Sequence, residues 1–108
     1  MNSRTLDRQT LDDIVQRIVA AAQPEKIILF GSAARGEMGP NSDVDLLVVK
    51  DTDDARGLAV RIYRHLRGVR VAVDAVVVKP ANVERYKDSH ALVIKPALRE
   101  GTVVYDAA

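Results

Sequence analysis

The sequence predicts a mixed α/β fold, of the α+β kind, in which helices flank one mixed sheet of about four strands. Short runs rich in valine, isoleucine and leucine alternate with longer segments in which apolar residues recur at helical spacing. Prolines and glycines separate these segments, and the chain contains no internal repeat or low-complexity tract. At 108 residues, it is expected to form a single domain over residues 1–108.

Two long segments have the apolar periodicity of an amphipathic helix. Residues 6–22 place apolar side chains on one face, and Pro24 ends the segment. The second segment is expected to run to about Arg67 and to stop at Gly68. Three residues can supply the cap at its N-terminus: Asp51, Thr52 and Asp53.

Four apolar runs are predicted to be strands, and three shorter segments are predicted to be helical. The strands cover residues 26–30, 43–49, 69–78 and 102–105. The shorter helical segments cover residues 33–35, 80–86 and 89–100. The resulting order of elements is typical of one sheet with helices packed against it.

Composition excludes several classes of protein. The 16 basic and 15 acidic residues give a formal net charge of +1, which argues against binding to nucleic acid through bulk charge. Only 4% of residues are aromatic, so stacking platforms for single-stranded nucleic acid are not expected. The absence of cysteine removes disulfides and thiolate metal sites, and fits a reducing compartment. No apolar run approaches a membrane span and no signal-peptide core is seen, so a cytoplasmic protein without membrane contact is expected.

Two acidic residues begin the second predicted strand and point to the same side of it. Asp43 and Asp45 are separated by one residue, and side chains alternate between the two faces of a strand. The apolar residues that follow, Leu46 to Val49, indicate a central strand, where neighbouring carboxylates resist burial. A divalent cation between them would remove this penalty, and oxygen ligands without cysteine favour Mg²⁺ or Mn²⁺. The alternative is a structural pair or cap at the end of the strand.

A third carboxylate lies within the valine-rich run of residues 69–78. Asp74 would be costly to bury there without a partner. If its strand lies beside residues 43–49, Asp74 can face the same site as the first two acids. Three converging carboxylates are typical of a two-metal site for in-line displacement at phosphorus. Taken alone, Asp74 is equally compatible with an exposed acid near the edge of a sheet.

The residues after the first predicted strand supply a candidate phosphate site. Gly31 permits close approach of the backbone, and the Ser32 hydroxyl can donate to a phosphate oxygen. The N–H groups of a helical turn beginning here could cradle phosphate. Arg35 can neutralise phosphate charge or form a local ion pair. Ser42, directly before Asp43, is a further nucleotide-binding candidate, although it can instead cap the loop.

These residues resemble a known signature. The segment GSAARGEMGPNSDVDLLVV, with a third acid on a later strand, is similar to the Gly-Ser-x10-Asp-x-Asp pattern of the polymerase-β-type nucleotidyltransferase superfamily. Within it, the chain looks most like the minimal nucleotidyltransferases, or MNT domains. The resemblance runs from the first helix to the closing REGTVVYD and implies the nucleotidyltransferase fold. The signature positions that match are Gly31, Ser32, Asp43, Asp45 and Asp74.

The resemblance also implies a reaction and its cofactors. Asp43 and Asp45 would hold two Mg²⁺ ions that bridge the triphosphate of the donor substrate, ATP. Asp74 would help to hold the metal on the acceptor side and would activate an attacking hydroxyl. Gly31 and Ser32 would bind the outer phosphates, and transfer of AMP would release pyrophosphate.

The same resemblance implies a partner. MNT domains commonly pair with a small helical HEPN protein as a toxin–antitoxin couple, in which the MNT member is the antitoxin and can adenylylate its partner on tyrosine. Two alternatives stay open. The chain could be a non-catalytic antitoxin that neutralises its partner by contact. It could also transfer a nucleotide to a small molecule such as an aminoglycoside, with a pocket built by a homo-oligomer.

Overall fold

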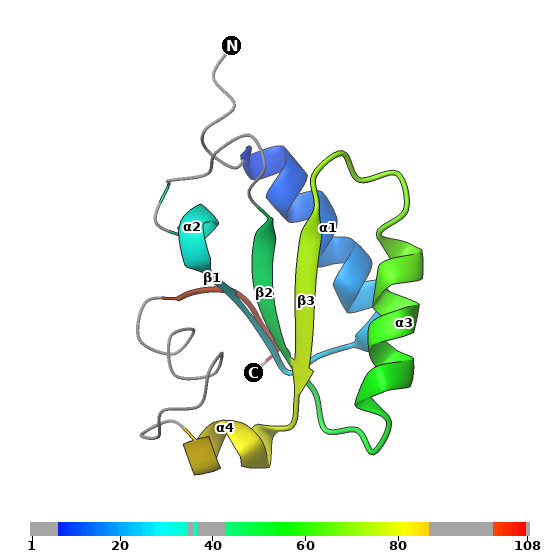
Figure 1. Cartoon of the computed structure of the whole chain (residues 1–108), viewed down its shortest axis with the longest axis vertical. Coiled ribbons are helices and arrows are strands. Elements are labelled where there is room, and N and C mark those ends of the chain that lie inside the picture. The colour runs from blue at the N-terminus through cyan, green and yellow to red at the C-terminus, as the bar shows by residue number, and fades with distance from the viewer. Residues whose placement is uncertain (1–6, 35, 37–42, 87–100, 108) are drawn as a thin grey trace.

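The computed structural model describes residues 7–34, 36, 43–86 and 101–107. The strands form one sheet in the order β3-β2-β1-β4, in which β2 and β3 are parallel and the other neighbours are antiparallel. This four-stranded mixed sheet flanked by helices confirms the predicted fold class (Figure 1). In chain order the elements are α1 (Arg8–Ala22), β1 (Lys26–Phe30), α2 (Gly31–Ala34), β2 (Val44–Val49), α3 (Ala55–His65), β3 (Val73–Val78), α4 (Pro80–Tyr86) and β4 (Thr102–Asp106).

Helix α1 is bounded by local features of its sequence. The Asp7 carboxylate accepts a hydrogen bond from the Thr10 N–H at 3.3 Å and caps the first turn. At the other end, Gln23 adopts a left-handed conformation with φ of 46°, and the helix stops. The predicted helix over residues 6–22 is therefore confirmed, with its start at Arg8. Within the described ranges, no helix is long and apolar enough to cross a membrane.

Helix α3 begins later than the sequence predicts. Its N-cap is Asp54, whose carboxylate accepts a hydrogen bond from the Gly57 N–H at 2.9 Å. The predicted caps are therefore wrong: Asp51, Thr52 and Asp53. The Thr52 hydroxyl instead accepts a hydrogen bond from the Asp54 N–H at 3.1 Å. Each of these polar residues can cap a helix, and the turn made at Thr52 decides which one does.

Strand β3 is shorter than predicted. Its first paired residue is Val73, opposite Val44, so pairing starts where β2 starts. Val69 and Val71, just before this strand, pack against the core without joining the sheet. Their apolar character therefore reflects core packing and does not indicate a strand. The prediction of a strand over residues 69–78 is therefore wrong for its first part. The other three strands agree with the sequence to within one residue.

Two of the three short helical predictions can be compared with the structure. The single turn expected at residues 33–35 corresponds to α2, which begins directly after β1. The helix expected over residues 80–86 is α4. The third, over residues 89–100, lies outside the described residues.

The two faces of the sheet differ in what packs against them. Helices α1 and α3 cover one face (Figure 1), over buried side chains that include Ile27, Leu46 and Ala75. The intervening strand positions point to the opposite side, called here the second face. There, Ile28 and Leu47 form a smaller apolar cluster. The second face is therefore defined as the side of the sheet away from α1 and α3.

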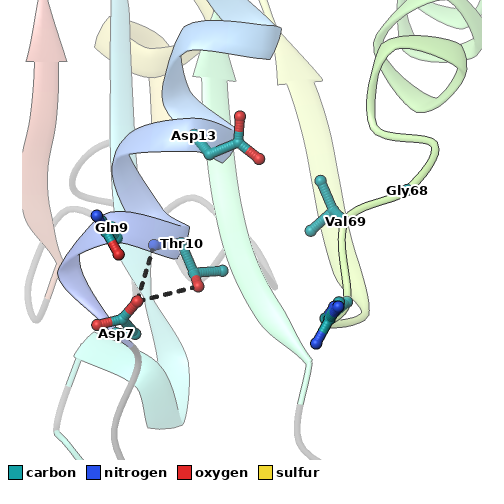
Figure 2. Close-up of a pocket in the computed structure, with 7 residues that line it drawn as sticks. Asp7, Gln9, Thr10, Asp13, Gly68 and Val69 are labelled. Carbon is teal, nitrogen blue, oxygen red and sulfur yellow. Dashed lines mark hydrogen bonds between the residues drawn. The ribbon is translucent and has the colours of Figure 1, made fainter.

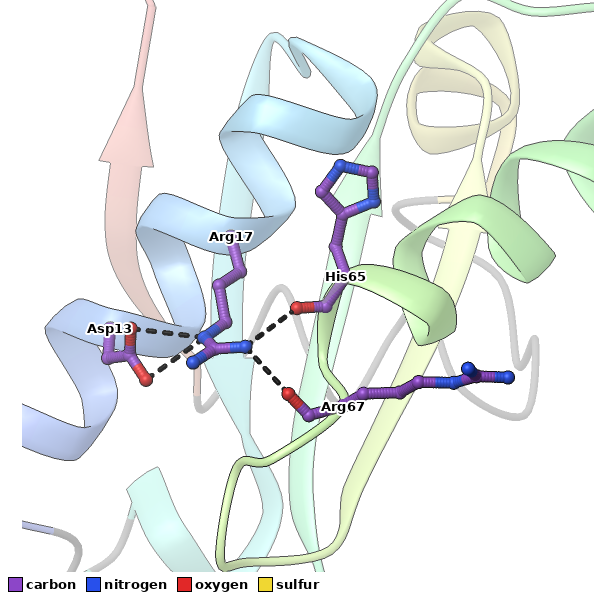
Figure 3. Close-up of polar contacts among 4 residues, drawn as sticks. All are labelled: Asp13, Arg17, His65 and Arg67. Carbon is purple, nitrogen blue, oxygen red and sulfur yellow. Dashed lines mark hydrogen bonds and ion pairs between the residues drawn. The ribbon is translucent and has the colours of Figure 1, made fainter.

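An arginine joins the two helices that cover the first face. Nη1 of Arg17, on α1, donates to the carbonyl oxygens of His65 and Arg67 at 3.0 and 2.8 Å (Figure 3). Its Nε donates to the Asp13 carboxylate at 3.0–3.1 Å. The last carbonyls of a helix have no partner within the helix. Arg17 therefore satisfies carbonyls at the end of α3 and fixes the turn that leads to β3.

Candidate active site

Asp45 and Asp74 lie opposite each other on neighbouring strands. They are partners in the parallel pairing of β2 with β3. The next residue on each strand, Leu46 and Ala75, belongs to the core under the helices, so both carboxylates point to the second face. Neighbouring strands are about 4.8 Å apart. The structure thus brings Asp74 beside the acids of β2, although the two strands are separated in the chain by the whole of α3.

Asp43 completes an acidic cluster, defined here as Asp43, Asp45 and Asp74. Asp43 is exposed directly before β2, Asp74 is exposed on β3, and Asp45 is half-buried between them. Burial raises the pKa of the Asp45 carboxyl above its ordinary value, and the negative charges of Asp74 and Asp43 raise it further. Both exposed acids therefore act electrostatically on the same central carboxylate.

Gly31 approaches this cluster from β1. It follows Phe30, which pairs with Asp45, and its φ of 75° lies in the left-handed region. A Cβ at this position would collide with Oδ2 of Asp45 and would lie 3.3 Å from Cγ. A side chain at position 31 therefore suits neither the backbone conformation nor the available space. The sequence predicted close backbone approach at Gly31, and the structure shows that the neighbour is a carboxylate of the site itself.

Ser32 follows in α2, the single helical turn at the end of the sheet where β2 and β3 begin (Figure 1). This turn contacts both β1 and β2. The Ser32 side chain is half-buried, and its hydroxyl makes no hydrogen bond with another described residue. A serine hydroxyl at this position can donate to a ligand that lies beside the acidic cluster.

The donor chemistry of the acidic cluster fits magnesium. In the described part of the chain, no group of three carboxylate or histidine side chains is arranged to hold a metal ion by itself. Magnesium does not need one, because one or two carboxylates commonly bind it while water and substrate phosphates supply the other ligands. A cation beside Asp45 would also relieve the repulsion that raises the pKa of that carboxyl. The residues present therefore fit a magnesium ion that arrives with phosphates.

Two predicted nucleotide-binding residues, Arg35 and Ser42, lie outside the described residues. Their positions relative to the acidic cluster consequently stay predictions. Of the seven residues proposed for the site, the structure describes the other five: Gly31, Ser32, Asp43, Asp45 and Asp74. All five lie at one end of the sheet, around the start of β2 and β3.

A separate cleft of about 350 Å³ lies between the start of α1 and the turn that follows α3 (Figure 2). None of the described site residues lines it. Its two carboxylates already have partners, because Asp7 accepts from Thr10 and Asp13 accepts from Arg17. The remaining lining residues are Gln9, Gly68, Val69 and Arg70. This cleft is therefore distinct from the acidic cluster.

Comparison with known proteins assigns the chain to a family. The family model of the nucleotidyltransferase domain matches residues 9–102, which include every predicted site residue. The chain belongs to this family. A crystal structure of a protein from Sulfolobus solfataricus, assigned as a nucleotidyltransferase, matches this nucleotidyltransferase domain with a TM-score of 0.61 and 20% identity, over 92% of this chain and 79% of the other. At that identity, the match shows a shared fold. No curated protein matches the sequence.

One contact in this nucleotidyltransferase domain was not predicted from the sequence. It is the approach of Gly31 to Asp45, which depends on the register between β1 and β2. That register pairs Phe30 with Asp45 across a long connection, and no local pattern specifies it. The available signal was a glycine directly after a strand, which indicates close approach without identifying the neighbour.

Proposed function

We propose that this nucleotidyltransferase domain transfers AMP from ATP to a hydroxyl group in a reaction that requires Mg²⁺. The observation that carries the proposal is the in-register pair Asp45 and Asp74 on one face of the sheet. Gly31 lies directly against Asp45 of that pair, and the half-buried Ser32 follows it in the chain. This arrangement supports a site at which carboxylates and hydrogen-bond donors meet one phosphate-bearing ligand.

The proposed chemistry is an in-line displacement at phosphorus. The acceptor oxygen attacks the α-phosphorus of ATP, the bond to the bridging oxygen breaks, and pyrophosphate leaves. Asp74 accepts the proton of the attacking hydroxyl. Asp43 and Asp45 would hold the metal, and Asp74 would help to hold it on the acceptor side. Ser32 would donate to an outer phosphate oxygen. Bound Mg²⁺ would neutralise the triphosphate and stabilise the leaving group.

We also propose that the acceptor is a protein. The support is the resemblance of the Gly-Ser and Asp-x-Asp segments to MNT domains, which pair with small helical HEPN proteins. In this proposal the chain is an antitoxin that acts in the cytoplasm and adenylylates a tyrosine hydroxyl of its partner. Transfer to a small molecule and neutralisation by contact alone are the outcomes that the acceptor experiment distinguishes.

Calorimetric titration with ATP tests the nucleotide site. We expect saturable binding in the presence of Mg²⁺, no binding in EDTA, and loss of binding in Asp45→Asn. Asp51→Asn is the matched control, because Asp51 is an exposed carboxylate just beyond the other end of β2. Equal affinities of the unmodified protein and Asp45→Asn would contradict this assignment of the site.

Co-expression with the product of the neighbouring gene, followed by intact-mass measurement, tests the acceptor. A partner that gains the mass of one AMP, and does not gain it beside Asp45→Asn, supports transfer to protein. A stable complex without a mass change, formed equally by Asp45→Asn, supports neutralisation by contact. If the partner is absent from the complex and an aminoglycoside gains AMP instead, the acceptor is a small molecule.

A further inference from the structure

Tyr63 of α3 binds the outer edge of β3, one residue after Asp74. The Ala75 N–H donates to the Tyr63 hydroxyl oxygen at 2.9 Å, and this hydroxyl lies 3.5 Å from the Ala75 carbonyl oxygen. Tyr63 is 42% exposed, so burial alone does not fix the position of its ring. The contact with the strand is therefore the feature that requires explanation.

Backbone hydrogen bonds show that Ala75 faces away from β2. The Val44 N–H donates to the Ala72 carbonyl, and the Lys50 N–H donates to the Val78 carbonyl. In a strand, the backbone groups of successive residues point to alternate sides, so the even-numbered residues of this segment face β2. Ala75 consequently faces the outer edge, where the described residues provide no further strand.

The peptide between Asp74 and Ala75 is thus held from two sides. By the same alternation, the backbone of Asp74 faces β2, whereas that of Ala75 is bound by Tyr63. We propose that Tyr63 is a positioning residue that keeps the Asp74 carboxylate beside Asp45. This inference rests on the proposed function, because it concerns the carboxylates to which that function assigns metal binding and proton transfer.

A physical reason for such a support lies in the charges of the cluster. Asp45 and Asp74 are in register, so two carboxylates lie opposite each other on neighbouring strands. Like charges directly opposite each other destabilise a strand pair, and an edge strand has no neighbouring strand on its other side to hold it. The Tyr63 hydroxyl supplies a bond on that side. Phenylalanine would keep the ring and remove only this bond.

Binding of Mn²⁺ alone, followed by electron paramagnetic resonance, tests the inference without a nucleotide or an acceptor. We expect Tyr63→Phe to bind Mn²⁺ about three- to tenfold more weakly, the range that corresponds to one lost hydrogen bond. Tyr105→Phe is the matched control, because the Tyr105 hydroxyl makes no hydrogen bond with another described residue. It should bind Mn²⁺ as the unmodified protein does. An unchanged affinity in Tyr63→Phe overturns the inference.

A double-mutant cycle separates positioning from general destabilisation. If Tyr63 acts through Asp74, adding Tyr63→Phe to Asp74→Asn should cause no further loss of Mn²⁺ affinity. Independent, multiplying losses would overturn the inference, since they would show that Tyr63 acts elsewhere. Amide hydrogen exchange checks the fold of Tyr63→Phe: faster exchange at Ala75 is expected, with full protection retained in α1.

The failure of this inference can be told apart from the failure of the proposed function. If the unmodified protein binds neither Mn²⁺ nor ATP with Mg²⁺, the proposed function is overturned, and the role of Tyr63 falls with it. If the unmodified protein binds both and Tyr63→Phe binds Mn²⁺ equally well, only the positioning role is overturned.

Discussion

Gly31 lies so close to Asp45 that a side chain at position 31 would collide with the Asp45 carboxylate. The turn after β1 and the acidic cluster therefore form one continuous surface. Gly31 is required there for two separate reasons, its φ of 75° and the contact itself. The two reasons can be separated by experiment, because another glycine of the chain shares only the first.

Gly31→Ala is expected to destabilise the protein and to abolish ATP binding. Left-handed backbone at a residue with a side chain costs roughly 1–2 kcal/mol, and displacement of the Asp45 carboxylate adds to that cost. Gly36→Ala is the matched control, because Gly36 has φ of 70° and a Cβ at this position would meet no atom of the described residues within 4 Å. Urea unfolding compares the two variants. Equal losses of unfolding free energy would contradict a significant contact between Gly31 and Asp45.

Asp45→Asn is expected to stabilise the protein at pH 7 in EDTA, although it abolishes nucleotide binding. The ordinary pKa of the carboxyl is 3.8, and its pKa in the folded protein is higher. The favourable contribution of the Asp45 carboxyl to the free energy of unfolding is therefore present below pH 3.8. It is lost as the pH rises through the pKa of the folded protein. Asparagine carries no charge, so Asp45→Asn should be more stable than the unmodified protein at neutral pH, and the difference should become smaller at acidic pH.

Melting temperatures measured against pH test this expectation. Asp51→Asn should follow the unmodified protein at every pH, since Asp51 lies outside the acidic cluster. Mg²⁺ should raise the melting temperature of the unmodified protein and leave that of Asp45→Asn unchanged. A lower melting temperature of Asp45→Asn at pH 7 in EDTA would show that the cluster is not under electrostatic strain.

Arg17→Ala is expected to reduce the unfolding free energy by about 1–3 kcal/mol, because hydrogen bonds to a charged group are lost at two carbonyls of the α3 terminus. The matched control is Arg8→Ala. Arg8 pairs with Asp12 at 3.7 Å, but the two side chains are 89% and 59% exposed, so a change within about 0.5 kcal/mol is expected. Urea unfolding measures both variants, and equal effects would remove the structural role assigned to Arg17.

Asp54→Ala is expected to cost about 1 kcal/mol of stability, the usual cost of losing an N-cap. Asp51→Ala should have little effect, although the sequence predicted Asp51, and not Asp54, among the possible caps. The comparison by urea unfolding tests the start of α3 that the structure shows. A larger loss in Asp51→Ala than in Asp54→Ala would place the cap where the sequence first suggested.

The sequence was most informative where one local signal acted alone. Strand β1 is predicted residue for residue, because an apolar run is bounded by Pro24 and Gly31. The sequence was less informative where several residues could play one role, as at the cap of α3. It failed before Val73, where apolar residues serve the core from a turn and not from a strand. Hydrophobicity indicates that a residue is buried, whereas backbone hydrogen bonds to a neighbouring strand determine whether it belongs to a strand.

The residues of the candidate site also differ in how far the sequence predicts their positions. The side shared by Asp43 and Asp45 follows from the alternation of a single strand. The position of Asp74 beside them depends on which strands are neighbours. From the sequence alone, it could only be stated that Asp74 faces the same site if its strand lies beside residues 43–49. The supports of the cluster were not predictable, because Gly31 and Tyr63 reach it through register and through helix packing. Both are set by contacts between segments far apart in the chain.

The one parallel pairing of the sheet has a consequence for when the site comes into existence. Asp45 and Asp74 meet only after α3 has crossed from the end of β2 back to the start of β3. Contacts between segments distant in the chain form later during folding than contacts between near ones. A nascent chain that has paired β1 with β2 already brings Gly31 against Asp45, but it lacks the third carboxylate. Completion of the crossover thus delays the acidic cluster, which is assembled by the same event that adds β3 to the sheet.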